Sequence, residues 1–145
     1  NDRWNRTIDT NLNSIFYTCR AAVSRLNRHG RIVLVSSTAA QRGEAFHADY
    51  AATKGAMISL VKGLCIEVAP RGITVNAVAP GWIDTEMSAS ALVSNERDRI
   101  TRSIPIGRIA TAKDVSGPIV FLCSELARHI TGEVVNINGG AVLPG

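Results

Sequence analysis

Apolar residues recur at helical spacing along the first part of the chain and predict a long helix from Trp4 to about Leu26. The members of this apolar stripe are Trp4, Ile8, Leu12, Ile15, Phe16, Cys19, Val23 and Leu26. The polar run from Asn27 to Gly30 ends the helix, because glycine is suited to a left-handed cap.

A short apolar run, rich in β-branched residues, predicts a strand at residues 31–36, and residues 73–79 and 133–138 are predicted as a second and a third strand. Runs without polar alternation are typical of strands that are buried on both faces of a parallel sheet. The second run ends at Pro80-Gly81.

The segments between these strands read as helix and loop. Small and polar residues at 37–48 predict a loop, and apolar spacing predicts a helix from Asp49 to about Ala69, which Pro70 and the following glycine stop. The segment 82–110 is polar and irregular, with a partly helical stretch near residues 95–102.

A capping box predicts the start of the last helix. The Thr111 side chain can accept from the backbone of Asp114, whose carboxylate reaches back, and the helix then runs to about Leu126. Pro118 falls inside this helix, where proline removes one hydrogen bond and clashes with the preceding turn. We therefore expect a kink or a late start there.

The alternation of helix and strand predicts an α/β fold with a parallel sheet and right-handed crossovers, in one domain that covers residues 1–145. Ligands of such sheets gather at the carboxyl ends of the strands. Ser36 and Ser37 follow the first strand at this edge, and Tyr50 opens the helix after their loop.

Composition argues against several classes of function. The net charge of +4 is modest and the arginines are dispersed, which argues against a nucleic-acid surface. No apolar run approaches the roughly eighteen residues of a membrane span. The start of the chain lacks the layout of a signal peptide, and it also lacks an initiator Met, so truncation has to be considered.

The three cysteines have no metal-ligand spacing, so we expect no metal site. Cys19, Cys65 and Cys123 stand among apolar neighbours and are expected to be buried, reduced thiols. Reduced thiols favour a cytoplasmic location.

Tyr50 and Lys54 are the strongest candidates for chemistry. Their i, i+4 spacing places them on one helix face, with Ser37 thirteen residues upstream of the tyrosine. A nearby ammonium favours the ionised phenol, which can then exchange a proton with a substrate oxygen near neutral pH. The Ser37 hydroxyl can hydrogen-bond the same oxygen. An ordinary surface helix that carries a tyrosine and a lysine is the simpler alternative.

With these residues in this order, the chain resembles the short-chain dehydrogenase/reductase family over its whole length. The resemblance implies that Ser37 polarises the substrate oxygen and that Tyr50 is the acid/base. It also implies that Lys54 lowers the pKa of the tyrosine and binds the nicotinamide ribose. Asn11 matches the asparagine that holds a water in the proton relay.

The resemblance also implies a cofactor, NAD or NADP. The run from Asn76 to Pro80 and Gly81 resembles the segment beneath the nicotinamide. Ile83 and Thr85 resemble positions that contact the carboxamide. The residues expected to contact the cofactor are Tyr50, Lys54, Pro80, Gly81, Ile83 and Thr85.

The sequence departs from the family at its start. Family members usually begin with a strand and a Thr-Gly-x-x-x-Gly-x-Gly turn that receives the pyrophosphate, and no such run occurs here. The chain therefore resembles the C-terminal three-fifths of a Rossmann-like, doubly wound parallel sheet, without the phosphate-binding half.

The resemblance implies an oxidoreductase that moves hydride between a nicotinamide and a secondary alcohol or ketone, and the substrate could be a 3-oxoacyl thioester. A truncated, non-catalytic remnant or interaction module is the alternative, and an epimerase or dehydratase is a third. The two long helices carry wide apolar faces, and family members commonly pair them, so a homodimer or homotetramer is expected. No nucleic-acid or membrane partner is expected.

Overall fold

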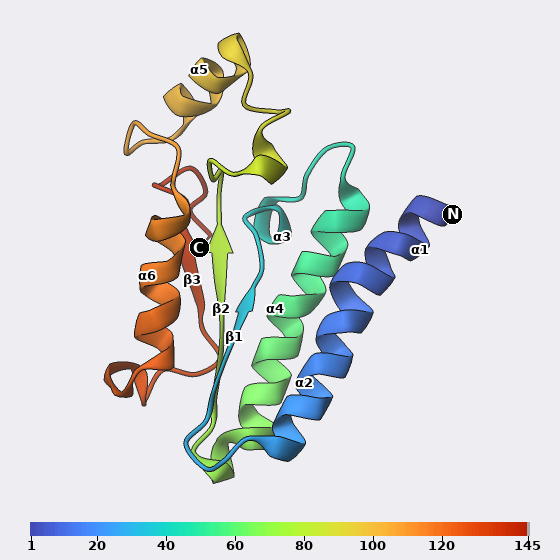
Figure 1. The fold of residues 1–145 in the computed structure, drawn as a ribbon, viewed down its shortest axis with the longest axis vertical. Helices are drawn as coiled ribbons and strands as arrows, with labels where there is room; N and C mark the ends of the chain where they lie inside the picture. Colours follow the sequence, from blue (N-terminus) through green and yellow to red (C-terminus); the bar gives the residue numbers. More distant parts are fainter. Residues whose placement is uncertain (145) are drawn as a thin grey trace.

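Three parallel strands form the sheet of the computed structural model, which describes residues 1–144, with Ser94 described by its backbone alone (Figure 1). The strands are β1 (Arg31–Val35), β2 (Thr74–Pro80) and β3 (Val134–Ile137), in the order β1-β2-β3. Ala77 at the centre of β2 pairs with Leu34 on one side and with Val134 on the other. The predicted parallel α/β fold is confirmed.

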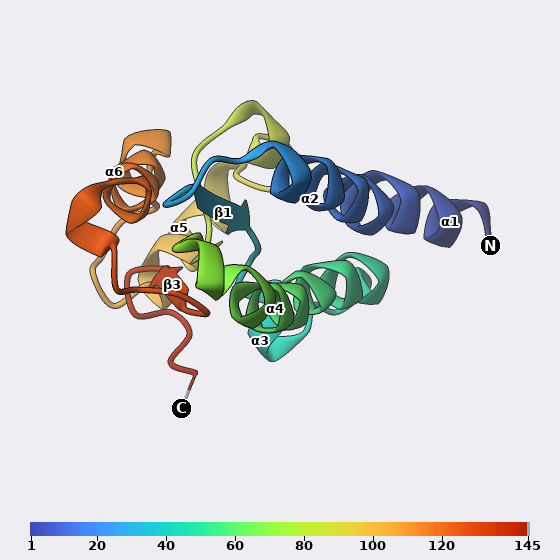
Figure 2. The ribbon, with the colours of Figure 1, turned by 90° about the horizontal axis from the view of Figure 1, so that it is seen from below.

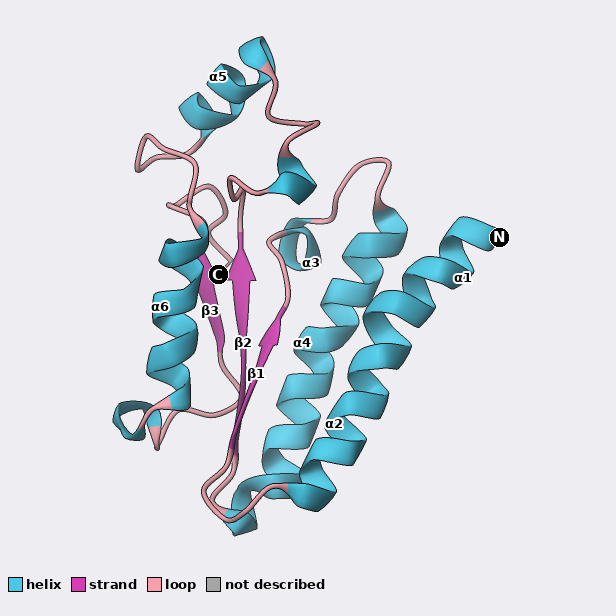
Figure 3. Ribbon diagram, in the orientation of Figure 1, coloured by secondary structure: helices cyan, strands magenta, loops and turns pink. Residues whose placement is uncertain are grey.

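Helices cover both faces of this sheet (Figure 2). One layer contains α1 (Asp2–Ile8), α2 (Ser14–Arg25) and α4 (Ala48–Val68), and α6 (Ala112–Cys123) lies on the opposite face. The remaining helical pieces, visible in Figure 3, are α3 (Ala39–Arg42), α5 (Ser94–Ser103), and the 3-10 turns Ala69–Arg71, Glu86–Ser88 and Glu125–Ala127. The two layers on a parallel sheet give the Rossmann-like arrangement that the sequence predicts.

Each face of the sheet has its own core. Residues of α2 and α4 pack against one face of β1 and β2, with Val61 and Val75 fully buried. Leu122 of α6 packs on the other face against Val78. All seven positions of β2 are buried, as expected of the central strand in a parallel sheet that is covered on both faces.

One polar side chain, Asn76, is fully buried in β2. Its Nδ2 donates to the Ile130 carbonyl at 2.9 Å, and its Oδ1 accepts from the Glu133 amide at 3.1 Å. Because buried polar groups need partners, this side chain fixes the turn that leads into β3.

The long first helix is confirmed, but it is not a uniform α-helix. Residues Asp9–Asn13 form a π-helical segment between α1 and α2. The apolar periodicity does not reveal this segment, because one extra residue in a turn leaves the pattern on either side intact. Such π segments often lie at functional sites, and Asn11 is in the middle of this one.

The start of α6 is where the capping box predicts it. Thr111 and Asp114 bond reciprocally, and the helix begins at Ala112. The late start suggested by Pro118 is therefore wrong, since the helix continues through the proline. Burial of Leu122 and Val115 contributes about 1.5–3 kcal/mol each, which offsets the roughly 3 kcal/mol that an interior proline costs.

Two other expectations need correction. The predicted loop at 37–48 contains the short helix α3, which four small and polar residues form. Cys19 and Cys65 are buried as expected, but Cys123 is exposed because it lies in the last turn of α6 and faces away from the sheet core. All three are free thiols.

Among residues 1–144, no helix combines the length and apolar character that crossing a membrane requires. No group of three potential ligands is gathered for a metal ion within that range.

Candidate functional site

Two hydrogen bonds connect the carboxyl end of β1 to helix α4. The Ser36 hydroxyl, on a residue only 3% exposed, donates to the Lys54 carbonyl at 2.9 Å. Lys54 Nζ donates to the Val35 carbonyl at 2.8 Å. Two consecutive residues of the strand end thus hold the backbone and the ammonium of the same lysine.

Lys54 and Tyr50 lie together on α4 as their spacing predicts. Lys54 Nζ is 5.6 Å from the centroid of the half-buried Tyr50 ring. Burial lowers the pKa of Lys54, and no carboxylate pairs with its ammonium among the described residues. An ammonium over an aromatic ring at this distance makes a cation–π contact, which places the two side chains together on α4.

Ser37 begins the turn that becomes α3. Its Oγ accepts a hydrogen bond from the Ala39 amide at 3.1 Å. A serine hydroxyl carries one proton to donate, and in this bond it only accepts, so its proton is available for an acceptor such as a substrate oxygen.

Asn11 reaches α4 from the π-helical segment. Its Nδ2 donates to Thr53 Oγ1 at 3.3 Å, and that hydroxyl donates to the Tyr50 carbonyl at 2.7 Å. The structure therefore brings Asn11 to the same turn of α4 as Tyr50 and Lys54. Thr53 is fully buried between them, and the sequence analysis did not single it out. Its position one turn after Tyr50, on the same face, is the signal that could have found it.

The second group of predicted residues follows β2. The Pro80 carbonyl accepts from the Thr38 amide at 3.0 Å, which places the end of β2 beside the loop that carries Ser37. The Gly81 amide donates to the Ile137 carbonyl at 3.0 Å, so this glycine continues the pairing with β3.

Ile83 and Thr85 lie farther along the same segment. Ile83 forms an isolated parallel bridge with Ala110, and Thr85 caps the short turn that follows, where its amide donates to Ser88 Oγ at 3.1 Å. Both therefore lie in the 82–110 segment above the sheet edge (Figure 1). Nothing in the structure bonds them to Tyr50 or Lys54.

A surface hollow adjoins this second group. Trp82 and Ile104 line it from the 82–110 segment, and Asn136 and Asn138 line it from β3 and the turn after it. Polar amides and apolar side chains therefore meet at the carboxyl edge of the sheet, where ligands of parallel sheets gather.

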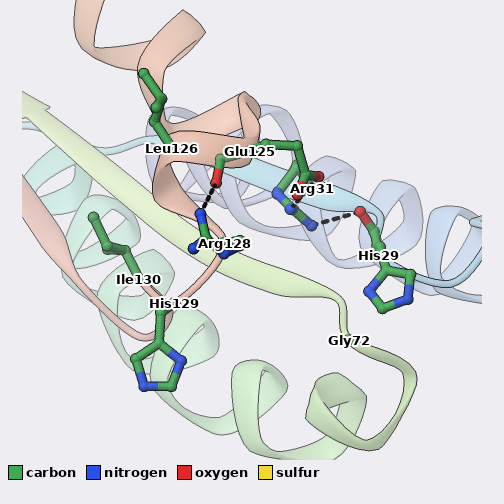
Figure 4. A pocket seen from close by; sticks show the side chains of 8 residues that line it. All are labelled: His29, Arg31, Gly72, Glu125, Leu126, Arg128, His129 and Ile130. Carbon is green, nitrogen blue, oxygen red and sulfur yellow. Dashed lines mark hydrogen bonds and ion pairs between the residues drawn. The ribbon is translucent and has the colours of Figure 1, made fainter.

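A larger hollow lies at the other end of the strands (Figure 4). His29, Arg31 and Glu125 line it with Arg128 and His129, and none of the predicted site residues does. The Arg31 side chain is only 8% exposed and pairs with Glu125 at 3.0 Å. Because the buried guanidinium bonds to the fold's own groups, we place the candidate site at the carboxyl edge.

Comparison with known proteins gives a match along nearly the whole chain. The family model described as Enoyl-(Acyl carrier protein) reductase matches residues 1–142. The chain is 42% identical over 141 residues to the 3-oxoacyl-(acyl-carrier-protein) reductase of Escherichia coli, covering 96% of this chain and 57% of that protein. It is 40% identical to an L-rhamnose 1-dehydrogenase (NAD(P)(+)) of Azotobacter vinelandii, covering 93% of this chain and 54% of the relative.

Solved structures match the fold equally well. A short-chain dehydrogenase/reductase (glucose/ribitol dehydrogenase) from Brucella melitensis has a TM-score of 0.93 at 39% identity, over 97% of this chain and 56% of that one. A short-chain type dehydrogenase/reductase from Mycobacterium ulcerans has a TM-score of 0.91 at 29% identity, over 97% and 52%. The chain thus spans little more than half the length of these proteins.

Proposed function

The chain belongs to the short-chain dehydrogenase/reductase family, and from this premise we propose that it supplies the catalytic part of a nicotinamide-dependent oxidoreductase acting on a secondary alcohol or ketone. The single observation that supports this best is the ammonium of the half-buried Lys54 at 5.6 Å from the centroid of the Tyr50 ring, at the carboxyl edge of the sheet.

The proposed chemistry uses four side chains in the reducing direction. The hydroxyls of Ser37 and Tyr50 donate hydrogen bonds to the substrate carbonyl oxygen, which polarises the carbonyl. Tyr50 then gives up its proton to that oxygen, and the Lys54 charge stabilises the phenolate that remains. Bound NAD or NADP would exchange the hydride with the substrate carbon. Asn11 would hold a water that returns a proton to the Tyr50 phenolate.

The residues present fit the nicotinamide riboside end of such a cofactor. Lys54 has an unpaired ammonium with two protons not used by Val35, which suits the hydroxyls of a ribose. We propose that Tyr50 and Lys54 bind this ribose. The segment with Pro80, Gly81, Ile83 and Thr85 would contact the nicotinamide, since it lies at the same sheet edge.

We propose a 3-oxoacyl thioester as the substrate, on the strength of the similarity to the 3-oxoacyl-(acyl-carrier-protein) reductase of Escherichia coli. The rhamnose dehydrogenase is almost as similar, so the test of substrate must include sugars. A panel of 3-oxoacyl thioesters and aldoses, offered to the intact protein with each nicotinamide cofactor, would separate these two classes of substrate.

We also propose a homodimer or homotetramer in the cytoplasm, with a small-molecule substrate and no nucleic-acid or membrane partner. Exposed aromatic side chains on the first long helix support self-association, because Trp4, Phe16 and Tyr17 are each about half exposed, at 50%, 47% and 56%. The free thiols agree with a reducing compartment.

Changing Tyr50 to Phe tests the proposed acid/base. Y50F removes only the hydroxyl, so we expect turnover to fall by at least about 100-fold while the circular dichroism spectrum stays as in the parent. The matched control is Tyr17→Phe, on the exposed face of α2, which should keep parental activity. Activity retained in Y50F would refute the acid/base role, and a parent protein without turnover would favour the non-catalytic alternative.

A further inference from the structure

Arg3, in the first turn of α1, binds the segment that leads into the helix of Tyr50. Its Nε donates to Asp49 Oδ2 at 3.0 Å and its Nη2 donates to Oδ1 at 3.0 Å, so the pair is bidentate. The same Nη2 donates to the Phe46 carbonyl at 2.9 Å. The guanidinium therefore fixes both ends of the segment 46–49.

Phe46 has a strained backbone. Its φ is +63°, in the left-handed region, which costs a residue with a side chain about 1–2 kcal/mol. Its side chain is 92% exposed, so packing does not hold this conformation. Two hydrogen bonds hold it: the His47 amide donates to the Glu44 carbonyl at 3.1 Å across the turn, and Arg3 donates to the Phe46 carbonyl. Strain of this kind beside a candidate site is a reason to look for a functional role.

Asp49 is well placed to receive the arginine. Its side chain is 11% exposed, and Thr7 Oγ1 also donates to its carboxylate at 3.0 Å. Asp49 lies in the first turn of α4, where the helix dipole favours an anion. Burial favours the neutral acid, but the hydrogen bonds from Thr7, the Tyr50 amide and Arg3 outweigh it and lower the pKa of Asp49.

The effect of Arg3 concerns position more than stability. Its side chain is 64% exposed, and exposed ion pairs contribute at most about 1 kcal/mol to the free energy of unfolding. Tyr50 is the residue directly after Asp49, however, and a shift of about 1 Å at a reacting group can cost about 100-fold in rate.

We propose that Arg3 is a positioning residue for Tyr50, which it places through the Asp49 carboxylate and the Phe46 carbonyl. The inference rests on the proposed function for its effect on turnover. The hydrogen bonds from Arg3 to Asp49 and Phe46 can be tested without measuring turnover. If they order the segment 46–50, this segment should lose order when the guanidinium is removed.

The test compares Arg3→Met, Arg3→Lys and Arg6→Met in the intact protein. Arg6 lies one turn along α1 and forms no side-chain bond with the described residues, so R6M should match the parent. We expect R3M to lower kcat about tenfold and leave the KM of the cofactor within about twofold. R3K keeps the charge but cannot make all three bonds, so its kcat should be intermediate.

Hydrogen exchange supplies the readout that does not depend on activity. In R3M the amides of residues 46–50 should exchange at least about tenfold faster, since they open locally, while those of β2 stay unchanged. Adding Phe46→Gly, which accepts a positive φ without strain, should restore part of the lost kcat. A merely stabilising role would not give this rescue.

Parental kcat and parental exchange in R3M would overturn the proposal, as would equal losses in R3M and R6M. If R3M does not fold, R3K and Thr7→Val are compared with R6M instead. Thr7→Val removes the hydrogen bond from Thr7 to the Asp49 carboxylate. Turnover that survives in Y50F would refute the proposed function, and the exchange data would still decide whether Arg3 orders the segment.

Discussion

Lys54 combines a functional charge with a cost to stability. The side chain is half-buried, which disfavours the charged form and lowers the pKa of Lys54. The hydrogen bond from its ammonium to the Val35 carbonyl compensates only in part, because a carbonyl neutralises no charge. A residue that is expensive to bury and yet retained is typical of a site where charge does chemistry.

Replacing Lys54 by Met should therefore separate stability from activity. The folded lysine releases its proton at a lower pH than the unfolded one, whose pKa is about 10.4. Between these two pKa values the unfolded chain binds more protons, so the free energy of unfolding of the parent rises with pH. K54M should lack this rise, and its turnover should fall by at least about 100-fold.

Urea unfolding between pH 7 and pH 10 measures this difference in the intact protein. The matched control is Lys62→Met on the exposed side of the same helix, which should keep the parental pH dependence. If K54M and K62M show the same slope of unfolding free energy against pH, burial of Lys54 has no energetic consequence and the argument fails.

At the scale of elements, the ends of β2 and β3 approach each other very closely. A Cβ on Gly81 would lie 3.0 Å from the Asn138 Cβ and 3.2 Å from its Cα. The Asn138 Cα is a backbone atom, so moving it would cost more free energy than moving the end of a flexible side chain. The glycine is therefore required by packing between two chain segments, at the point where the proposed nicotinamide contacts begin.

Gly81→Ala should destabilise the fold by about 1–3 kcal/mol through overpacking and should weaken cofactor binding. Gly63→Ala is the matched control, since a Cβ at the exposed Gly63 in α4 meets nothing within 4 Å. Alanine there should stabilise the helix by about 0.5–1 kcal/mol. Thermal and urea unfolding compare the two variants, and an equal effect of both substitutions would contradict the packing argument.

At the scale of the whole molecule, exposed aromatic groups form a surface on α2. The Phe16 and Tyr17 rings meet edge to face with centroids 5.6 Å apart, and the Arg20 guanidinium lies 5.7 Å and 5.5 Å from them. Aromatic and arginine side chains are enriched at protein interfaces. This surface is the one we expect a second copy of the chain to cover.

The double substitution Phe16→Glu and Tyr17→Glu should reduce the oligomer to a smaller species, because it places two charges in the proposed interface. Sedimentation velocity measures the change, with circular dichroism to verify the fold. Leu126→Glu, at an exposed apolar position near the other end of the sheet, is the control. An unchanged sedimentation coefficient in the double variant would exclude this interface.

The sequence was sufficient for features that local patterns encode. The run before Pro80 predicts a fully buried strand, and the pairing of Thr111 with Asp114 predicts the start of α6. The i, i+4 spacing places Lys54 beside Tyr50. In each case a period or a short motif carries the information.

Features that depend on distant residues could not be predicted. Arg3 and Asp49 are 46 positions apart, and no periodicity connects them. Cys123 stands among apolar neighbours in the sequence, yet it is exposed because the packing of α6 on the sheet decides which side of the helix is covered. The roles of Asn11, Ser37, Tyr50 and Lys54 remain predictions.

The π-helical segment Asp9–Asn13 sets the rotational phase between α1 and α2. Each residue of a helix turns the chain by about 100°, so the extra residue in this turn decides which way Arg3 points relative to α2. Deleting one residue from the segment would leave a regular helix and rotate its first two turns away from Asp49. A single-codon deletion in this segment could therefore misalign the acid/base without altering any residue of α4.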